Sequence, residues 1–153
     1  MTAPDDGLAA RLRDSFARQG LMRTLKAEMV AVAPGEVVLA APIRAEVSQQ
    51  NGFAHAAVAF ALGDSAAGYA ALSLMEPGDD VLTVEMKINL MAPARGDRLR
   101  ATGRVVRAGR RIAVVTAEIW AEADGEARQV ALMQGTMIPV RNAGGPERGQ
   151  GVK

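Results

Sequence analysis

The chain has no cysteine, a single histidine and few aromatic side chains. Without cysteine it can hold neither disulfides nor thiolate metal sites, and one histidine is too few for a histidine-rich metal site. With 3% aromatic residues there is no stacking platform for single-stranded nucleic acid. The 18 basic and 17 acidic residues nearly balance, so no global field attracts nucleic acid or an anionic membrane. An anionic ligand must therefore be bound by local groups.

At 153 residues the chain has the length of one globular domain. We expect an N-terminal helix over residues 1–20, a folded domain over 21–140 and a polar, glycine-rich, flexible tail over 141–153. The start of the chain has no basic segment followed by an apolar stretch, so we expect no secretory signal and a cytoplasmic location. The apolar run over 54–74 contains Asp64, and a charge near the centre of a membrane helix costs about 2.5–3.5 kcal/mol. A buried helix is therefore favoured over a membrane span.

The periodicity of apolar residues predicts two helices and six strands. Leu8, Leu12 and Phe16 recur every four residues, as in a short amphipathic helix that stops at Gly20. Over 82–90 apolar residues instead alternate with polar ones, which predicts a strand with one apolar and one polar face. Strands that follow one long helix and are joined by tight turns indicate an α+β domain with an antiparallel sheet. The predicted elements are helices over 5–19 and from about 55 to before the Pro77-Gly78 loop, and strands over 25–33, 36–43, 82–90, 98–107, 111–121 and 129–140.

The stretch over 49–71, QQNGFAHAAVAFALGDSAAGYAA, consists mostly of small apolar residues interrupted by His55 and Asp64. A helix of this composition can be buried on nearly all sides. A carboxylate in its middle must therefore be paired, placed at an interface or used in chemistry. Because the helical neighbours of Asp64 are apolar, we expect its face to be buried against a partner subunit.

These residues resemble the hotdog fold, and specifically the PaaI-like acyl-CoA thioesterases, over roughly 21–140. The strongest matches are QQNGFAHAAV leading into ALGDSAAGYAA, and LTVEMKINLMAPA with the proline that ends the strand. The resemblance implies a curved antiparallel sheet wrapped around one long central helix. It also implies an enzyme that hydrolyses an acyl-CoA thioester to a carboxylic acid and coenzyme A. No metal and no cofactor is expected besides the coenzyme A of the substrate.

The family typically has His-Gly-Gly at the start of the helix and an acidic residue nine positions after the histidine. This chain has His55-Ala56-Ala57 and then Asp64 at that distance. By this resemblance the Ala56 amide polarises the thioester carbonyl, because an N–H at a helix N-terminus is unsatisfied and at the positive end of the dipole. Asp64 would act as the nucleophile or as the base that activates water, and both roles stay open. The methyl group of alanine in place of glycine leaves less space for the substrate to approach the amide. We expect this difference to affect which acyl groups are accepted more than the catalysis.

Further polar residues match family positions. Gln49 matches an amide that orients substrate or water, and Asn51 is a second candidate for that role. Thr83 matches a hydroxyl that holds the attacking water or the carboxylate. His55 either contacts the substrate or satisfies backbone groups at the helix start.

Coenzyme A carries phosphates, which need cationic side chains or backbone amides. Basic residues flank the Ala108-Gly109 turn, and others stand near the end of the preceding strand. A solvated hairpin tip is the alternative interpretation of the cluster at the turn. The predicted substrate-binding residues are Asn51, Gly52, Lys87, Arg95, Arg107, Arg110 and Arg111.

The resemblance also implies self-association. The family pairs two domains into a continuous sheet, with the oxyanion amide from one chain and the acid from the other. We therefore expect a homodimer, assembled further into a dimer of dimers, and an inactive monomer. Two alternatives remain: a non-catalytic acyl-CoA-binding hotdog module, and a hotdog hydratase or dehydratase, whose histidine and carboxylate typically stand in a different local pattern.

Overall fold

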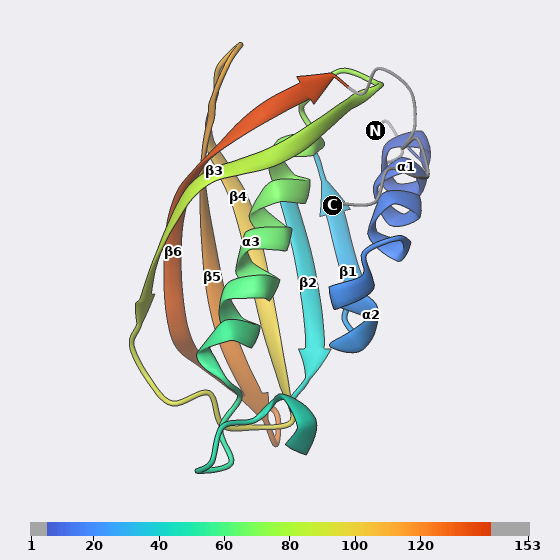
Figure 1. The fold of residues 1–153 in the computed structure, drawn as a ribbon. Coiled ribbons are helices and arrows are strands. Elements are labelled where there is room, and N and C mark those ends of the chain that lie inside the picture. The colour runs from blue at the N-terminus through green and yellow to red at the C-terminus, as the bar shows by residue number, and fades with distance from the viewer. Residues whose placement is uncertain (1–5, 142–153) are drawn as a thin grey trace, which may run out of the picture.

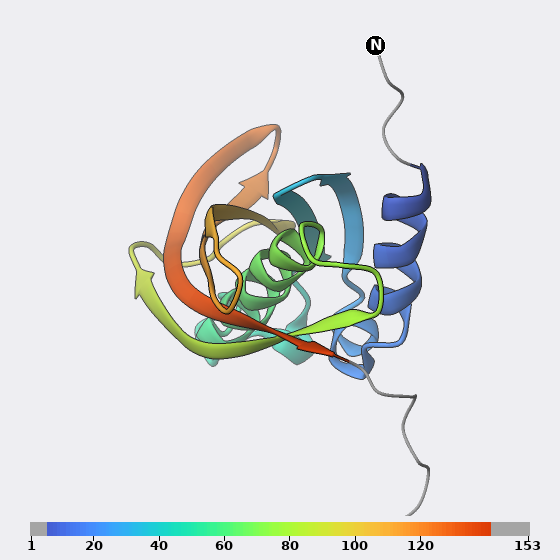
Figure 2. The ribbon, with the colours of Figure 1, turned by 90° about the horizontal axis from the view of Figure 1, so that it is seen from above.

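The computed structural model describes residues 6–141, which form a curved six-stranded antiparallel sheet around one long helix (Figure 1). The strand order is β1-β2-β4-β5-β6-β3. Seen from above, the strands curl around α3, and α1 lies outside beyond the β1 side (Figure 2). The elements are α1 Asp6–Ala17, α2 Gly20–Thr24, β1 Glu28–Ala33, β2 Glu36–Pro42, a 3-10 helix Ala45–Val47, α3 Ala56–Leu72, β3 Asp79–Leu90, β4 Arg98–Ala108, β5 Ala113–Ala123 and β6 Glu126–Arg141.

The α+β hotdog architecture predicted from the sequence is confirmed, with the two predicted helices and six predicted strands in order. The α2 turn and the 3-10 helix were not predicted, since Gly20 was interpreted as a stop and it instead begins α2. The predicted tail lies, apart from Arg141, outside the described residues. The division into three parts stays a prediction. Within residues 6–141 no helix is long and apolar enough to span a membrane.

Helix α3 is the centre of the core, and its small residues set how closely the sheet approaches. Most of α3 is buried against the concave face of the sheet. At Gly103 of β4 an added Cβ would fall on the backbone of Ala66 and Ala67, so only glycine allows this approach. The largest fully buried side chains among the described residues include Leu12, Met22, Leu39, Leu62, Leu99, Ile119, Met133 and Met137.

Strand β3 departs from the predicted alternation. Its register with β6 shifts between Thr83 and Glu85, which marks a β-bulge. The bulge reverses which face the side chains before it occupy. The predicted apolar face therefore holds for Met86 and Ile88, which pack against the core, and is wrong for Leu82 and Val84. Leu82 and Val84 are more than half exposed, whereas Thr83 contacts the buried side chain of Met137.

The N-terminal helices are fastened to the domain. Leu12 and Phe16 are buried, and the Phe16 ring meets Tyr69 of α3 edge-on at 5.8 Å between centroids. Arg13 Nη1 donates a hydrogen bond to the Met29 carbonyl of β1 at 2.5 Å. These contacts place α1 and α2 beside α3, where they can form part of a site.

The convex face of the sheet carries ion pairs, as its polar residues predict. Glu122 of β5 accepts hydrogen bonds from Arg100 Nε at 2.5 Å and Arg98 Nε at 2.6 Å. The bond from Arg100, followed by that from Arg98, lowers the pKa of the Glu122 carboxyl from its ordinary value. These residues are used within the sheet and are not candidates for a ligand site.

Replacing Gly103 tests the close approach of β4 to α3. Gly103→Ala forces the methyl group against helix backbone, and we expect a loss of about 3 kcal/mol in the free energy of unfolding. Gly20→Ala is the matched control, because its Cβ meets just the tip of Arg23 at 3.7 Å. The measurement is the urea midpoint of both variants. Equal midpoints for Gly103→Ala and wild type would contradict this account of the packing.

Candidate active site

The start of α3 presents one backbone N–H that has no acceptor among residues 6–141. His55 is the N-cap, and its Nδ1 accepts a hydrogen bond from the Ala57 N–H at 3.0 Å. The Val58 N–H bonds to the His55 carbonyl at 2.9 Å. No acceptor within residues 6–141 is recorded for the Ala56 N–H, and Ala56 is exposed. A single donor at the positive end of the dipole is thus open to a ligand.

The two alanines at the start of α3 adopt their backbone conformation without strain. Neither Ala56 nor Ala57 has a positive φ, and both are the first residues of a regular helix. Glycine is therefore not required here by backbone conformation. The alanine methyl groups change the space next to the amide and leave the amide itself in place.

A tight loop before α3 forms one wall of a hollow around this amide. Gln49 closes a turn in which the Gly52 N–H bonds to its carbonyl at 3.0 Å, with Gly52 at φ +79°. The Gln49 side-chain oxygen accepts from the Asn51 N–H, so the amide group is held by its own loop. Asn51 and Gly52 shape the loop and do not line the hollow.

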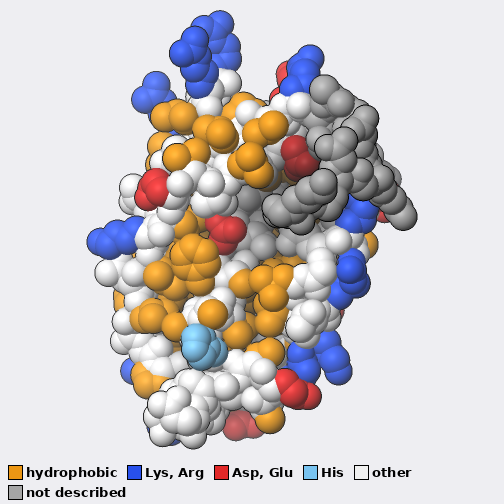
Figure 3. Space-filling model, in the orientation of Figure 1, with side chains coloured by type: hydrophobic (Ala, Val, Ile, Leu, Met, Phe, Trp, Pro, Cys, Tyr) orange, Lys and Arg blue, Asp and Glu red, His pale blue; other side chains and the backbone are white. Residues whose placement is uncertain are grey.

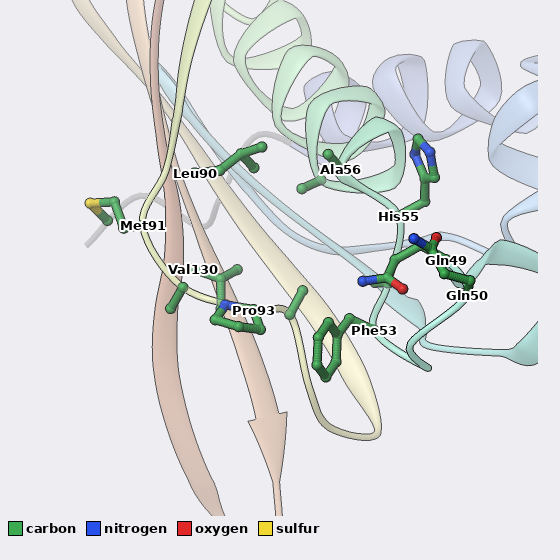
Figure 4. A pocket seen from close by; sticks show the side chains of 13 residues that line it. Gln49, Gln50, Phe53, His55, Ala56, Leu90, Met91, Pro93 and Val130 are labelled. Atoms are coloured by element: carbon green, nitrogen blue, oxygen red, sulfur yellow. The ribbon is translucent and has the colours of Figure 1, made fainter.

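We call this space the amide hollow; its volume is about 550 Å³ (Figure 4). Figure 4 shows Gln49, His55 and Ala56 on one side of it and Leu90, Met91 and Pro93 on the other. It is lined by Gln49, Gln50, Phe53, Ala54, His55, Ala56, Ala59, Leu90, Met91, Ala92, Pro93, Ala94 and Val130.

Asp64 lies two turns further along α3 and is paired with Thr83. The Thr83 hydroxyl donates a hydrogen bond to Asp64 Oδ1 at 2.7 Å. The β3 bulge makes this possible, because it turns Thr83 towards the helix. The sequence pattern placed Thr83 on a polar face away from the core, so the contact with the carboxylate came from the resemblance alone.

Asp64 borders a second space, between α3, β3 and the N-terminal helices. We call it the acid hollow; its volume is about 540 Å³. It is lined by Ser15, Arg18, Gln19, Leu21, Met22, Phe60, Ala61, Asp64, Ser65, Gly68, Tyr69, Leu72, Asp80, Val81 and Thr83. Sequence reasoning did not assign Ser15, Gln19 or Tyr69 to a site, and nothing in their spacing marks them, because the helices that carry them are brought together by tertiary packing.

The side of α3 that carries Asp64 is left uncovered by the sheet. Ala57 and Phe60 are exposed, and Ala61 and Asp64 are half-buried. In Figure 3 hydrophobic side chains spread over this face, with single acidic groups between them and the histidine below. An apolar stripe around a carboxylate on a helix surface is typical of an interface.

The Ala56 amide and the Asp64 carboxylate cannot act on one carbonyl within a single chain. Eight residues of helix separate them, which is about 12 Å along the axis. A reacting group must lie about 3 Å from both the oxyanion donor and the acid or base. They also border different hollows. A site that uses both needs groups from two copies of the chain.

The predicted basic residues are dispersed. Arg95 stacks its guanidinium on Phe53, a residue that lines the amide hollow, 4.2 Å from the ring centroid. Lys87 is exposed on β3. Arg107, Arg110 and Arg111 lie at the β4–β5 tip near the C-terminal end of α3. In the same chain this end is about 25 Å from the start of α3. Their role in binding stays a prediction.

A metal centre has no support in the described part of the chain. Residues 6–141 contain no group of three or more histidine, cysteine, aspartate or glutamate side chains that could hold an ion. The functional groups of the candidate site are a backbone amide, a carboxylate and a hydroxyl.

Comparison with known proteins agrees with this class of fold. The model of the thioesterase superfamily matches residues 51–128, just over half of the chain. The structure of a thioesterase family protein from Silicibacter pomeroyi is 45% identical, covers 89% of this chain and 100% of its own, and has a TM-score of 0.87. Escherichia coli PaaI, at 21% identity, covers 90% and 96% of the two chains with a TM-score of 0.80, which shows the shared fold.

A curated relative extends the comparison. The 1,4-dihydroxy-2-naphthoyl-CoA hydrolase of Listeria monocytogenes is 29% identical over 91 residues, which is 60% of this chain and 74% of the relative. The fold and these comparisons define a hotdog thioester hydrolase. The chain belongs to the thioesterase superfamily.

The cap at the start of α3 can be tested apart from any activity. His55→Ala removes the acceptor for the Ala57 N–H, and we expect a loss of about 1 kcal/mol in the free energy of unfolding. His55→Asn is the matched control, because asparagine is a strong N-cap residue and keeps an acceptor. Urea denaturation of the three proteins is the measurement. A destabilisation that is equal in both variants would show that the cap is not the stabilising contact.

Proposed function

We propose that this protein is an acyl-CoA thioesterase whose active sites form between two copies of the chain. One copy supplies the Ala56 amide and the other supplies Asp64 with Thr83. The observation that carries the proposal is the placement of a free helix N-terminal amide and a carboxylate on one uncovered face, about 12 Å apart along α3.

The amide and the acid have complementary tasks. The Ala56 N–H would donate to the carbonyl oxygen as negative charge develops on it. Asp64 would either take a proton from the attacking water or attack the carbonyl itself, with water then releasing the acyl group. In both routes the C–S bond breaks, a C–O bond to the acyl carbon forms, and water supplies the acid's oxygen and the proton of the free thiol. The Thr83 hydroxyl would orient the carboxylate.

Strand β3 supports the pairing of two copies. It is a sheet edge of 12 residues with no further strand beside it among residues 6–141. Leu82, Val84, Leu90 and Met91 on or next to it are all more than half exposed. A long apolar edge is a template for another strand. Pairing of β3 with its copy across a twofold axis is antiparallel, so the two α3 helices run in opposite directions and the start of one can approach the middle of the other.

Coenzyme A as the leaving group is supported by the Listeria relative, which is named for an acyl-CoA substrate. Arg95, beside the amide hollow, is suited to a phosphate of the nucleotide. The assembly into a dimer of dimers belongs to the same proposal and rests on the family resemblance. The cytoplasmic location predicted from the sequence is also part of the proposal.

Removal of the charge at position 64 tests the hydrolase. Asp64→Asn keeps the shape and the bond from Thr83, and we expect the rate of thiol release from acyl-CoA esters to fall by about 100-fold or more. Asp124→Asn is the matched control, because Asp124 is exposed in the β5–β6 turn, where asparagine also accepts its φ of +51°. An unchanged rate for Asp64→Asn in the assembled oligomer would overturn the proposal. Binding of acyl-CoA without thiol release by the wild type would select the binding-module alternative.

A composite site predicts complementation between two inactive variants. Ala56→Pro removes the donor while keeping the helix, because Ala56 is the first helical position and His55 has φ −61° and ψ 142°. We expect this variant to lose about 100- to 1,000-fold in rate. Mixed with Asp64→Asn and allowed to exchange subunits, it should recover about a quarter of wild-type activity, since half of the dimers then hold one intact site.

The control for complementation is each variant exchanged with itself, which restores nothing. Activity of the mixture no higher than that of the separate variants, with subunit exchange verified by mass, would place both groups of one site in the same chain. It would thereby contradict the composite arrangement without excluding hydrolysis.

A further inference from the structure

A buried sulfur lies beside the hydroxyl that contacts Asp64. The Thr83 hydroxyl, which donates a hydrogen bond to Asp64 Oδ1 at 2.7 Å, also lies 3.2 Å from the Met137 sulfur. We propose that Met137 is a positioning residue, whose sulfur is a second acceptor that keeps the Thr83 hydroxyl beside Asp64 when the charge of the carboxylate is lost. The inference rests on the proposed function, because it assigns a residue that supports the acid of that site.

Met137 is held in place on β6. Its side chain is fully buried, and its backbone pairs directly with Thr83 of β3 in the register of the two strands. A Cβ added at Gly68 would lie 3.9 Å from the Met137 methyl carbon, so the end of the side chain lies close to α3. The thioether is therefore next to both the central helix and the hydroxyl, inside a close-packed core that restricts its movement.

Another residue on the same face of β6 makes room for the bulge that turns Thr83 inward. Gly135 pairs with Met86, directly after the bulge. A Cβ on Gly135 would lie 2.5 Å from the Glu85 carbonyl oxygen, so the backbone of β3 occupies the space that a side chain would need. One strand thus supplies two features of the site: glycine admits the bent backbone of β3, and Met137 meets the hydroxyl.

The two acceptors around the Thr83 hydroxyl differ in strength. The hydroxyl has one proton, and among residues 6–141 its partners are the Asp64 carboxylate, a strong acceptor, and the Met137 sulfur, a weak one. The proton therefore bonds to Asp64 while the carboxylate is charged. In both proposed routes Asp64 loses that charge, by taking a proton or by bonding to the acyl carbon, and the bond from Thr83 weakens. The sulfur then gives the hydroxyl a partner and preserves its rotamer until the charge returns.

Met137→Leu tests the sulfur with little change in volume. Leucine fills nearly the same space, and we expect kcat for thiol release to fall about threefold to tenfold, with KM within about twofold of wild type. In the Thr83→Val background the same replacement should change kcat by less than about twofold, because no hydroxyl is left to hold. An equal fall in both backgrounds would show that Met137 acts through packing and would overturn the inference. An unchanged kcat with Thr83 present would also overturn it.

Met133→Leu is the matched control. Met133 is 1% exposed and lies four residues before Met137, on the same face of β6, and no hydrogen bond joins it to Thr83. It should keep the wild-type kcat in both backgrounds. A fall as large as that of Met137→Leu would contradict a specific role for the sulfur beside Thr83.

The contact can also be measured without turnover, by NMR of the assembled protein with ¹³C-labelled methionine methyl groups. The Met137 resonance is assigned by its absence in Met137→Leu. Asp64→Asn removes the charge, so the Thr83 proton moves towards the sulfur and the Met137 methyl resonance should shift. In the Thr83→Val background this shift should largely disappear. An equal shift in both backgrounds, or no shift with Thr83 present, would overturn the inference.

Thiol release separates this inference from the proposed function. A Met137 resonance that responds to Asp64→Asn just when Thr83 is present, without release of thiol from any acyl-CoA ester, would reject hydrolysis and support the sulfur contact. Thiol release with a kcat that Met137→Leu leaves unchanged would support hydrolysis and reject the role of Met137.

Discussion

The structure depends on the close contact between the sheet and α3. Gly103 allows β4 to lie directly on the backbone at Ala66 and Ala67, and this closeness lets a six-stranded sheet curl around a single helix. Burial of small side chains contributes little area per residue, so the stability of the core depends on the large residues that surround the contact. The curled sheet does not close around the helix. It leaves β3 as an edge and one stripe of α3 uncovered, and the candidate site is made of groups on that stripe.

The class of the fold could be predicted from the sequence because its periodicities are strong. The four-residue spacing of Leu8, Leu12 and Phe16 and the tight turns between the predicted strands gave elements that the structure contains. The α2 turn was not predicted from the sequence, because a glycine is interpreted as the end of a helix and Gly20 instead begins one. The acid hollow was not predicted for a different reason. No local pattern indicates that the N-terminal helices pack beside α3, because this packing results from the contact of Phe16 with Tyr69.

The β3 bulge was not predicted by the alternation of residues, yet it places Thr83 next to Asp64. Alternation over 82–90 has no glycine or proline to mark a break, so a regular strand was the prediction. In the structure the extra residue at position 84 costs the burial of Leu82 and Val84 and turns Thr83 onto Asp64. A local loss of packing is thus coupled to the placement of the one hydroxyl beside the carboxylate. Leu82 and Val84 would be buried again in the proposed pairing of two copies through β3.

The alanine pair at the start of α3 has a physical consequence for the amide. Because the backbone there is regular helix, alanine adopts it without strain and favours the helix more than glycine does by about 1 kcal/mol per residue in helix interiors. The first turn is therefore well ordered, with the Ala57 N–H held by His55 and the Ala56 N–H left free in a fixed direction. A donor that needs no reorganisation stabilises developing charge best. The methyl groups beside it reduce the space that a reacting carbonyl has next to the amide.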